Sequence, residues 1–256
     1  GHLALTQLKP EHIQKYQGEK LESGRRDRKG GLSARTVKHH HVVFHNALQT
    51  AVKWGLLARN PADAVTPPSV QRPEMCTWGE DEVRRFLEGA KNSPYFELFY
   101  LALFTGMRRS ELLALRWQDV DFIMAQVYVT RALHHLRDGR IVFRAPKTAK
   151  GRRAVALPPS AILLLGEYRK KQEQERALLG TALADDDLVF NQLGKPLLPN
   201  SVTHAWIKLV RRLKLAPIRL HDARHTHASL MLKQGIHPKI VQERLGHAGI
   251  QITLDT

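Results

Sequence analysis

The chain has 256 residues, 43% of them hydrophobic, and carries 40 Lys and Arg against 24 Asp and Glu. This length and composition allow one large domain or two smaller ones with their own cores, and exclude disorder throughout the chain. The formal net charge of +16 is spread along the whole sequence, which favours a polyanionic partner and indicates basic folded surfaces that face nucleic acid.

Cys76 is the only cysteine, so the sequence excludes an intramolecular disulfide and a cysteine-rich zinc site. A reducing cytoplasmic compartment permits such a lone thiol. No segment approaches the roughly 18 consecutive apolar residues of a membrane span, and no secretory signal peptide opens the sequence. We therefore expect a cytoplasmic protein with no membrane partner.

The first part of the chain predicts a small helical domain. Residues at helical spacing predict one helix from Pro10 to Leu21, and Ser33 is predicted to cap a long helix that ends at Gly55. The pair Pro67-Pro68 and the polar run after it are typical of a stiff interdomain linker. The predicted division is a helical domain at 1–66, a linker at 67–74 and a second domain at 75–256.

The second domain is predicted to be mainly α with a small antiparallel β-sheet. A capping box at Thr77-x-x-Glu80 opens it, and an apolar helix follows from Pro94 to Gly106. Three runs of β-forming residues predict the sheet, with Asp138-Gly139 as the turn between the first two. The runs are 127–130, 141–143 and 153–157. The remaining predicted helices start after Pro159, start after Asn200 as N-cap, and span 222–234 and 238–245.

The first segment with chemical potential is Thr105-Gly106-Met107-Arg108-Arg109-Ser110-Glu111-Leu112. A guanidinium at a helix start suits an anionic phosphate, and Glu111 can hold Arg108 in place from the same helix face. Taken alone, the pair is more typical of an ordinary surface ion pair than of a phosphate site.

A basic turn follows at Pro146-Lys147-Thr148-Ala149-Lys150-Gly151-Arg152-Arg153. A lysine on a hairpin tip can reach a nucleic-acid backbone and, with a lowered pKa, protonate a leaving oxygen. The alternative is a solvated cationic loop in which Lys147 has no catalytic part.

The densest segment is His221-Asp222-Ala223-Arg224-His225-Thr226-His227. Imidazoles that titrate near neutrality, placed beside an arginine, suit a phosphorus centre that gains negative charge. A zinc hydrolase is a second interpretation, because His221-x-x-x-His225 imitates a metalloprotease helix and His227 or His247 could serve as third ligand. Arg224 between the two ligands and the large positive charge oppose zinc. A purely structural role for the histidines is the third interpretation.

The last segment is Leu245-Gly246-His247-Ala248-Gly249. Gly246 is typical of a helix C-terminus, which would place His247 in an ordered turn. A free ring nitrogen there could donate a hydrogen bond to an oxyanion. On its own, the segment is just a turn with a histidine.

Together and in this order, these segments resemble the tyrosine recombinase family of the phage integrase type. The matching motifs are T-G-x-R-x-x-E at 105–111, the basic hairpin turn at Lys147, H-x-x-R at 221–224 and L-G-H at 245–247. The first 66 residues resemble the family's helical core-binding domain through Leu32-Ser33-x-x-Thr36-Val37 and Asn60-Pro61-Ala62. Each motif is common, but the four in sequence are specific. The Leu32-Ser33 and Asn60-Pro61-Ala62 stretches resemble those of mobile-element integrases more than those of housekeeping dimer resolvases.

The resemblance implies a core-binding domain followed by a mixed α+β catalytic domain, and a site-specific recombinase that cuts and rejoins DNA through a 3′-phosphotyrosyl intermediate. Such an intermediate stores the bond energy, so no cofactor is expected. The implied roles are phosphate binding by Arg108 and Arg224, proton transfer by His221, protonation of the departing 5′ oxygen by Lys147, a phosphate hydrogen bond from His247, and support of Arg108 by Glu111.

The sequence departs from the family pattern at the nucleophile. A tyrosine is expected shortly after the L-G-H motif, whereas all five tyrosines of the chain precede His221. The hypothesis is that the C-terminal end of the catalytic domain is missing, cut just before the tyrosine. We therefore expect this polypeptide to bind DNA without forming the covalent adduct.

Double-stranded DNA is the expected partner, held in a clamp between the two domains. Side chains at the start of the long N-terminal helix are the predicted contacts of the first domain. They are Ser33, Arg35, Thr36, Lys38 and His39. The resemblance further implies a homo-tetramer on paired DNA sites, with exchange of C-terminal segments between subunits. A DNA-binding regulator without catalysis is the main alternative.

Overall fold

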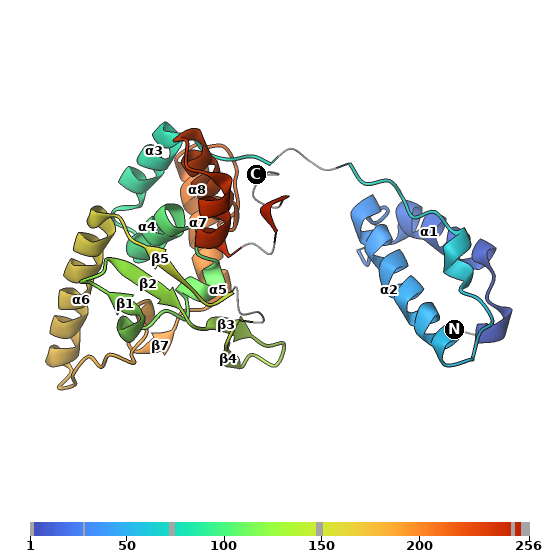
Figure 1. Ribbon diagram of the computed structural model, residues 1–256, viewed down its shortest axis with the longest axis horizontal. Helices are drawn as coiled ribbons and strands as arrows, with labels where there is room; N and C mark the ends of the chain where they lie inside the picture. The colour runs from blue at the N-terminus through green and yellow to red at the C-terminus, as the bar shows by residue number, and fades with distance from the viewer. Residues whose placement is uncertain (1–2, 28, 72–74, 147–150, 247–248, 252–256) are drawn as a thin grey trace. The chain divides into compact units, whose positions relative to one another are not determined.

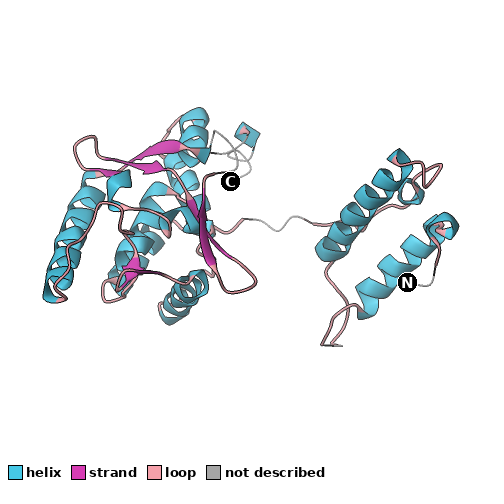
Figure 2. Ribbon diagram, turned by 90° about the horizontal axis from the view of Figure 1, so that it is seen from below, coloured by secondary structure: helices cyan, strands magenta, loops and turns pink. Residues whose placement is uncertain are grey.

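The structure is a computed structural model that describes residues 3–27, 29–71, 75–146, 151–246 and 249–251 (Figure 1). The chain divides into two compact units, Gly1–Glu74 and Met75–Thr256, each with its own hydrophobic core. Helices predominate and the strands are short (Figure 2), which confirms the predicted fold class. Within the described ranges, no helix has both the length and the apolar character needed to cross a bilayer.

The first unit is a helical pair. Its elements are η1 (Leu5–Gln7), α1 (Pro10–Ser23), α2 (Ala34–Lys53) and η2 (Pro61–Ala64). Ile13 of α1 and Leu48 of α2 meet Ala62 and Val65 in its small core. The Ser33 hydroxyl accepts a hydrogen bond from the backbone N–H of Thr36 at 3.2 Å, so Ser33 is the N-cap of α2 as predicted.

The second unit contains seven α-helices and seven short strands within the described residues. The helices are α3 (Glu80–Ala90), α4 (Phe96–Thr105), α5 (Arg109–Leu112), α6 (Pro159–Leu178), α7 (Pro199–Arg212), α8 (Asp222–Lys233) and α9 (Pro238–Leu245), with η3 (Trp117–Asp119) as a 3-10 turn. The strands are β1 (Val120–Asp121), β2 (Gln126–Val129), β3 (Ala132–His135), β4 (Ile141–Arg144), β5 (Arg153–Ala156), β6 (Asn191–Gln192) and β7 (Lys195–Pro196).

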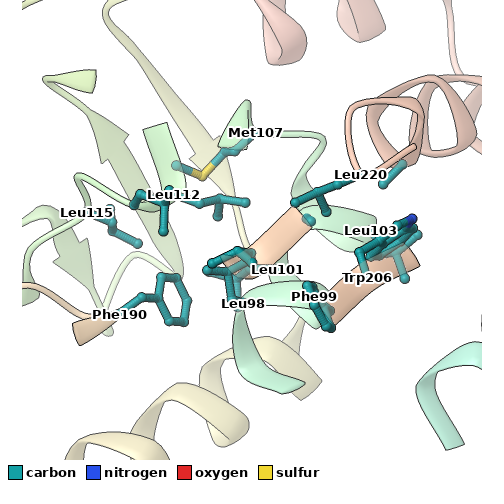
Figure 3. Packing of buried hydrophobic residues seen from close by; sticks show 14 of the residues in the cluster. Leu98, Phe99, Leu101, Leu103, Met107, Leu112, Leu115, Phe190, Trp206 and Leu220 are labelled. Carbon is teal, nitrogen blue, oxygen red and sulfur yellow. The ribbon is translucent and has the colours of Figure 1, made fainter. Parts of the chain in front are cut away.

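Helix α4 lies at the centre of the second unit. Its residues are apolar apart from Glu97, Tyr100 and Thr105, most of them are buried, and it packs against α6 and α8. Leu98, Phe99, Leu101 and Leu103 of α4 enter the core together with Trp206 of α7 (Figure 3). Because its C-terminal end leads straight into the Thr105-Gly106-Met107-Arg108 segment, this rigid helix fixes where Arg108 begins.

The strands form three separate small sheets instead of the single predicted one. β2 pairs antiparallel with β1 and β5, with Val127 opposite Val155, while β3 pairs only with β4. The predicted Asp138-Gly139 turn therefore joins β3 to β4, not β2 to β4. The sequence does not predict β3, because its Ala-Leu-His-His sequence lacks β-branched residues. β2 pairs with β5 because Val127 and Val129 of β2 and Val155 of β5 are buried in the same core.

Three helix starts also differ from prediction, and one is that of α4, which begins at Phe96 instead of Pro94. α3 begins after Gly79, whose N–H donates to the Glu82 carboxylate at 2.7 Å. Thr77 is not its cap, because the neighbouring Trp78 is buried and donates its backbone N–H to Thr226 Oγ1 at 3.1 Å. α7 begins at Pro199 with Leu198 before it, so Asn200 lies inside the first turn, where proline's fixed φ already starts the helix.

Candidate active site

Gly106 forms the turn between α4 and Arg108. Its φ of +63° is the left-handed conformation that glycine adopts at little cost. A Cβ at this position would lie 2.5 Å from Leu245 Cδ2 and 2.9 Å from the ring of His227, so the turn passes closely under α8 and α9. The tight turn brings the start of α5 to the ends of both helices.

Arg108 follows in extended conformation as the N-cap residue of α5, with a side chain that is 39% exposed. Glu111, only 5% exposed, accepts hydrogen bonds from the Arg108 backbone N–H and from Arg108 Nη1, both at 2.8 Å. The carboxylate therefore fixes the Arg108 backbone and side chain together, and leaves one side of the guanidinium to solvent.

Arg153 of β5 binds the same carboxylate from the other side. Its Nη1 and Nη2 donate to the two Glu111 oxygens at 3.1 and 2.9 Å in a two-pronged pair. Burial opposes the ionisation of Glu111, but the hydrogen bonds and charges of Arg153 and Arg108 outweigh it and hold the pKa of Glu111 below its ordinary value. Glu111 is thus an anion shared by two arginines.

Arg224 of α8 is buried at 3% exposure and has no carboxylate within 4.0 Å in the described part of the chain. Its Nη1 donates to the Gly106 carbonyl at 2.8 Å and its Nη2 to the Leu245 carbonyl at 2.5 Å. Burial, with repulsion from Arg108 and Arg153, lowers its pKa to about 9. A buried cation without a counter-ion costs free energy, which an anionic ligand would recover.

His221 lies at the N-terminal end of α8. Burial, together with the nearby His225 and Arg224, lowers the pKa of His221. His221 and Arg108 line one cavity of about 580 Å³, while Arg108, His134 of β3 and Gly246 line another of about 300 Å³. Arg108 therefore lies between two cavities, one lined by His221 and the other by Gly246 at the end of α9.

The described histidines of α8 and its N-terminal end, His221, His225 and His227, do not form a joint metal site. The rings of His221 and His225 meet edge to face, with centroids 5.6 Å apart. His227 Nε2 accepts a hydrogen bond from Arg244 Nε at 3.0 Å, and burial and Arg244 lower its pKa to about 3. No group of three His, Cys, Asp or Glu side chains in the described ranges is arranged to hold a metal ion.

Two predicted site residues, Lys147 and His247, lie outside the described residues. Their described chain neighbours Pro146, Gly151 and Gly246 line the cavity beside Arg108. Arg153 and Arg244 are not among the site residues that the sequence predicts. The one sequence feature that could indicate Arg153 is its place in the basic run from Lys147 to Arg153. Its partner Glu111 cannot be predicted from spacing, because it is 42 positions away.

The predicted DNA contacts of the first unit lie on the first two turns of α2. Arg35, Lys38 and His39 are exposed there. The hydroxyls of Ser33 and Thr36 lie 2.9 Å apart and hydrogen-bond each other while Ser33 caps the helix. The two hydroxyls are thus partly engaged within the unit, whereas Arg35, Lys38 and His39 are exposed to solvent.

The four tyrosines of the second unit lie in other surroundings. Tyr168 is partly buried, which raises its pKa to about 12, and the Tyr100 hydroxyl donates to Ser160 at 2.8 Å. Tyr95 packs against Phe99, and the Tyr128 hydroxyl binds the Gln126 amide at 2.6 Å. All four are described, and none of them hydrogen-bonds Arg108, Arg224 or His221.

Residues 78–255 match the phage integrase family. The chain is 32% identical over 227 residues to the ICEBs1 integrase of Bacillus subtilis, covering 88% of this chain and 61% of that protein. It is 28% identical over 269 residues to a XerC-like tyrosine recombinase of Caldanaerobacter subterraneus, covering 98% of this chain and 67% of that protein. The chain thus spans about three fifths to two thirds of the length of these curated relatives.

Solved structures have the same fold. The Tn1549 transposon integrase in complex with a circular intermediate DNA superposes with a TM-score of 0.81 at 20% identity, covering 100% of this chain and 82% of that one. A lambda integrase dimer bound to a COC′ core site gives 0.65 at 18% identity, covering 98% and 80%. The mainly α fold is that of a DNA recombinase catalytic domain. The chain belongs to the phage integrase family of tyrosine recombinases.

Proposed function

We propose that the chain is the core-binding and catalytic part of a site-specific DNA integrase, and that the pocket around Arg108 binds the phosphodiester to be cut. Family membership supports this reaction class. The observation that carries the proposal is Arg224, a buried guanidinium beside Arg108 with no acidic partner in the described structure. A phosphate diester provides the missing negative charge.

In this proposal Arg108 and Arg224 bind the two nonbridging oxygens of the phosphate. Glu111 holds the Arg108 guanidinium in position before the reaction, and the Gly106 and Leu245 carbonyls hold that of Arg224. Little reorganisation is therefore needed when negative charge builds up on the phosphate oxygens. A tyrosine oxygen forms the bond to phosphorus while the bond to the 5′ oxygen breaks. Lys147 would supply the proton to that oxygen, His221 would assist proton transfer, and His247 would donate to the phosphate.

We propose that this polypeptide carries out the binding part of the reaction and not the attack. All five tyrosines precede His221 in the sequence, and the four in the second unit are engaged elsewhere. The whole protein would act on paired sites as a homo-tetramer that exchanges C-terminal segments. The lambda integrase dimer on a core site supports two subunits for each site.

The phosphate proposal is tested by removing one DNA charge at a time. A duplex is first selected from a random library by its binding to this chain, and single neutral methylphosphonates are then placed along it. We expect one position per bound subunit where the neutral group weakens binding by about 10-fold or more, as for loss of a charged hydrogen bond. Arg108→Gln should abolish this penalty at that position.

Uniform penalties along the duplex, or an unchanged penalty in Arg108→Gln, would refute the proposal. Arg176→Gln is the matched control, because Arg176 of α6 binds Asp187 at 3.2 Å as a partly buried pair of the same kind. Since Arg176 does not line either cavity beside Arg108, the control should keep the full penalty of the unmodified chain.

A further inference from the structure

Two buried arginines bind the C-terminal end of α9. The last carbonyls of a helix have no partner within the helix and carry its partial negative charge. Arg153 Nε donates to the Arg244 carbonyl at 2.8 Å, and Arg224 Nη2 donates to the Leu245 carbonyl at 2.5 Å. These consecutive carbonyls directly precede Gly246, which ends the helix with a φ of +66°.

Arg153 uses most of its hydrogen-bonding capacity inside the protein. Its side chain is 6% exposed, and four of its five N–H donors serve the Arg244 carbonyl, both oxygens of Glu111 and the Gly151 carbonyl at 3.3 Å. A side chain so engaged does not bind DNA directly. Arg153 instead joins three segments: the start of α5, the turn before β5 and the end of α9.

We propose that Arg153 is a positioning residue of the phosphate site, which rests on the function proposed above. Through Glu111 it sets the orientation of Arg108, and through the Arg244 carbonyl it holds the end of α9, from which the chain continues to His247. The planar guanidinium can serve the carboxylate with one edge and the carbonyl with its Nε. A lysine, with a single ammonium group, reaches one of these partners at a time.

Charge balance within the cluster gives Arg153 a second effect on the phosphate. Arg108, Arg153 and Glu111 together carry one net positive charge. Without Arg153 the cluster becomes a neutral pair of Arg108 and Glu111, in which the carboxylate competes with DNA for the Arg108 guanidinium. Loss of Arg153 should therefore weaken phosphate binding although Arg153 does not touch DNA.

The test compares Arg153→Gln and Arg153→Lys with the unmodified chain on the selected duplex, with and without the methylphosphonate at the Arg108-dependent position. We expect Arg153→Gln to reduce the methylphosphonate penalty at least 5-fold. Affinity for the methylphosphonate duplex itself should stay within about 2-fold, because contacts elsewhere are unaffected. Arg153→Lys, which keeps the charge but not the fork, should also lose most of the penalty.

Circular dichroism and hydrogen exchange control for the fold. Both variants should keep the helical spectrum, with faster amide exchange confined to the end of α9 and the start of α5. A full penalty in both Arg153 variants, as in Arg176→Gln, would overturn the positioning role while leaving the phosphate proposal intact. Full rescue by Arg153→Lys would overturn it too, since charge alone would then suffice. Absence of any Arg108-dependent position would instead refute the proposed function itself.

Discussion

Gly106 meets two requirements at the residue scale, a left-handed backbone and the absence of a side chain. We expect Gly106→Ala to destabilise the second unit by about 2–4 kcal/mol, from about 1 kcal/mol of backbone strain and about 1–3 kcal/mol of overpacking against Leu245 and His227. Urea denaturation measures the loss.

Gly235 provides the matched control, because it follows α8 with a φ of +78° and has open space where a Cβ would lie. Gly235→Ala should lose only the strain component. Equal losses for the two alanine variants would show that the close approach at Gly106 has no energetic weight.

The arginines of the site show which side-chain hydrogen bonds can be predicted from a sequence and which cannot. Glu111 lies three positions after Arg108, so their contact follows from local spacing. Arg153 approaches the same carboxylate from 42 positions away, and Arg224 reaches the Gly106 carbonyl across 118 positions. Only the packing of β5 and α8 around α4 creates these contacts, and no local pattern reports them.

At the scale of one element, α8 carries a buried neutral imidazole with a predictable response to acid. The folded pKa of His227 is about 3, against an ordinary value of 6.5. Below pH 6.5 the unfolded chain takes up a proton that the folded chain does not, so stability falls with falling pH down to about pH 3. Between pH 7 and 5.5 we expect a loss of about 1 kcal/mol from this group.

Urea denaturation at both pH values, compared between the unmodified chain and His227→Gln, isolates this contribution. The difference between pH 7 and 5.5 should shrink by about 1 kcal/mol in His227→Gln. His204→Gln, which changes an exposed histidine of α7, should keep the original difference. An unchanged pH response in His227→Gln would mean that His227 does not stay neutral in the fold.

The N-terminal turns of α2 are the second element with a testable role. If Arg35 and Lys38 each neutralise one DNA phosphate, the double change to Gln should flatten the slope of log affinity against log salt by about 1.8. Lys53→Gln is the control, because Lys53 lies about 22 Å beyond Lys38 along the same helix, and this change should leave the slope nearly unchanged. An unaltered slope in the double variant would remove this surface from the DNA interface.

The elements themselves were predictable where strong signals mark their ends. Ser33 and Pro238 mark helix starts, and the observed helices begin at Ala34 and Pro238. The sequence does not reveal β3 or the correct strand pairing, because strands of four residues or fewer contain at most two periods of alternation. Pairing partners then depend on which core the buried side chains share.

At the scale of the whole molecule, the fold class followed from the sequence and is confirmed. The division into two units agrees with a chain whose polar, proline-containing stretch separates two sets of apolar residues. The clamp around DNA concerns how the two units are placed on a duplex, which neither spacing nor composition determines. It stays a prediction, together with the tetramer on paired sites.

We propose that this chain binds a DNA phosphate without attacking it, since all five of its tyrosines precede His221. The direct measurement is a pair of gels on one set of samples, using the selected duplex with single nicks that would trap a covalent intermediate. We expect a shifted band in the native gel, weakened by Arg108→Gln, and no protein–DNA band that survives denaturation in detergent. A detergent-resistant band from residues 1–256 alone would contradict it.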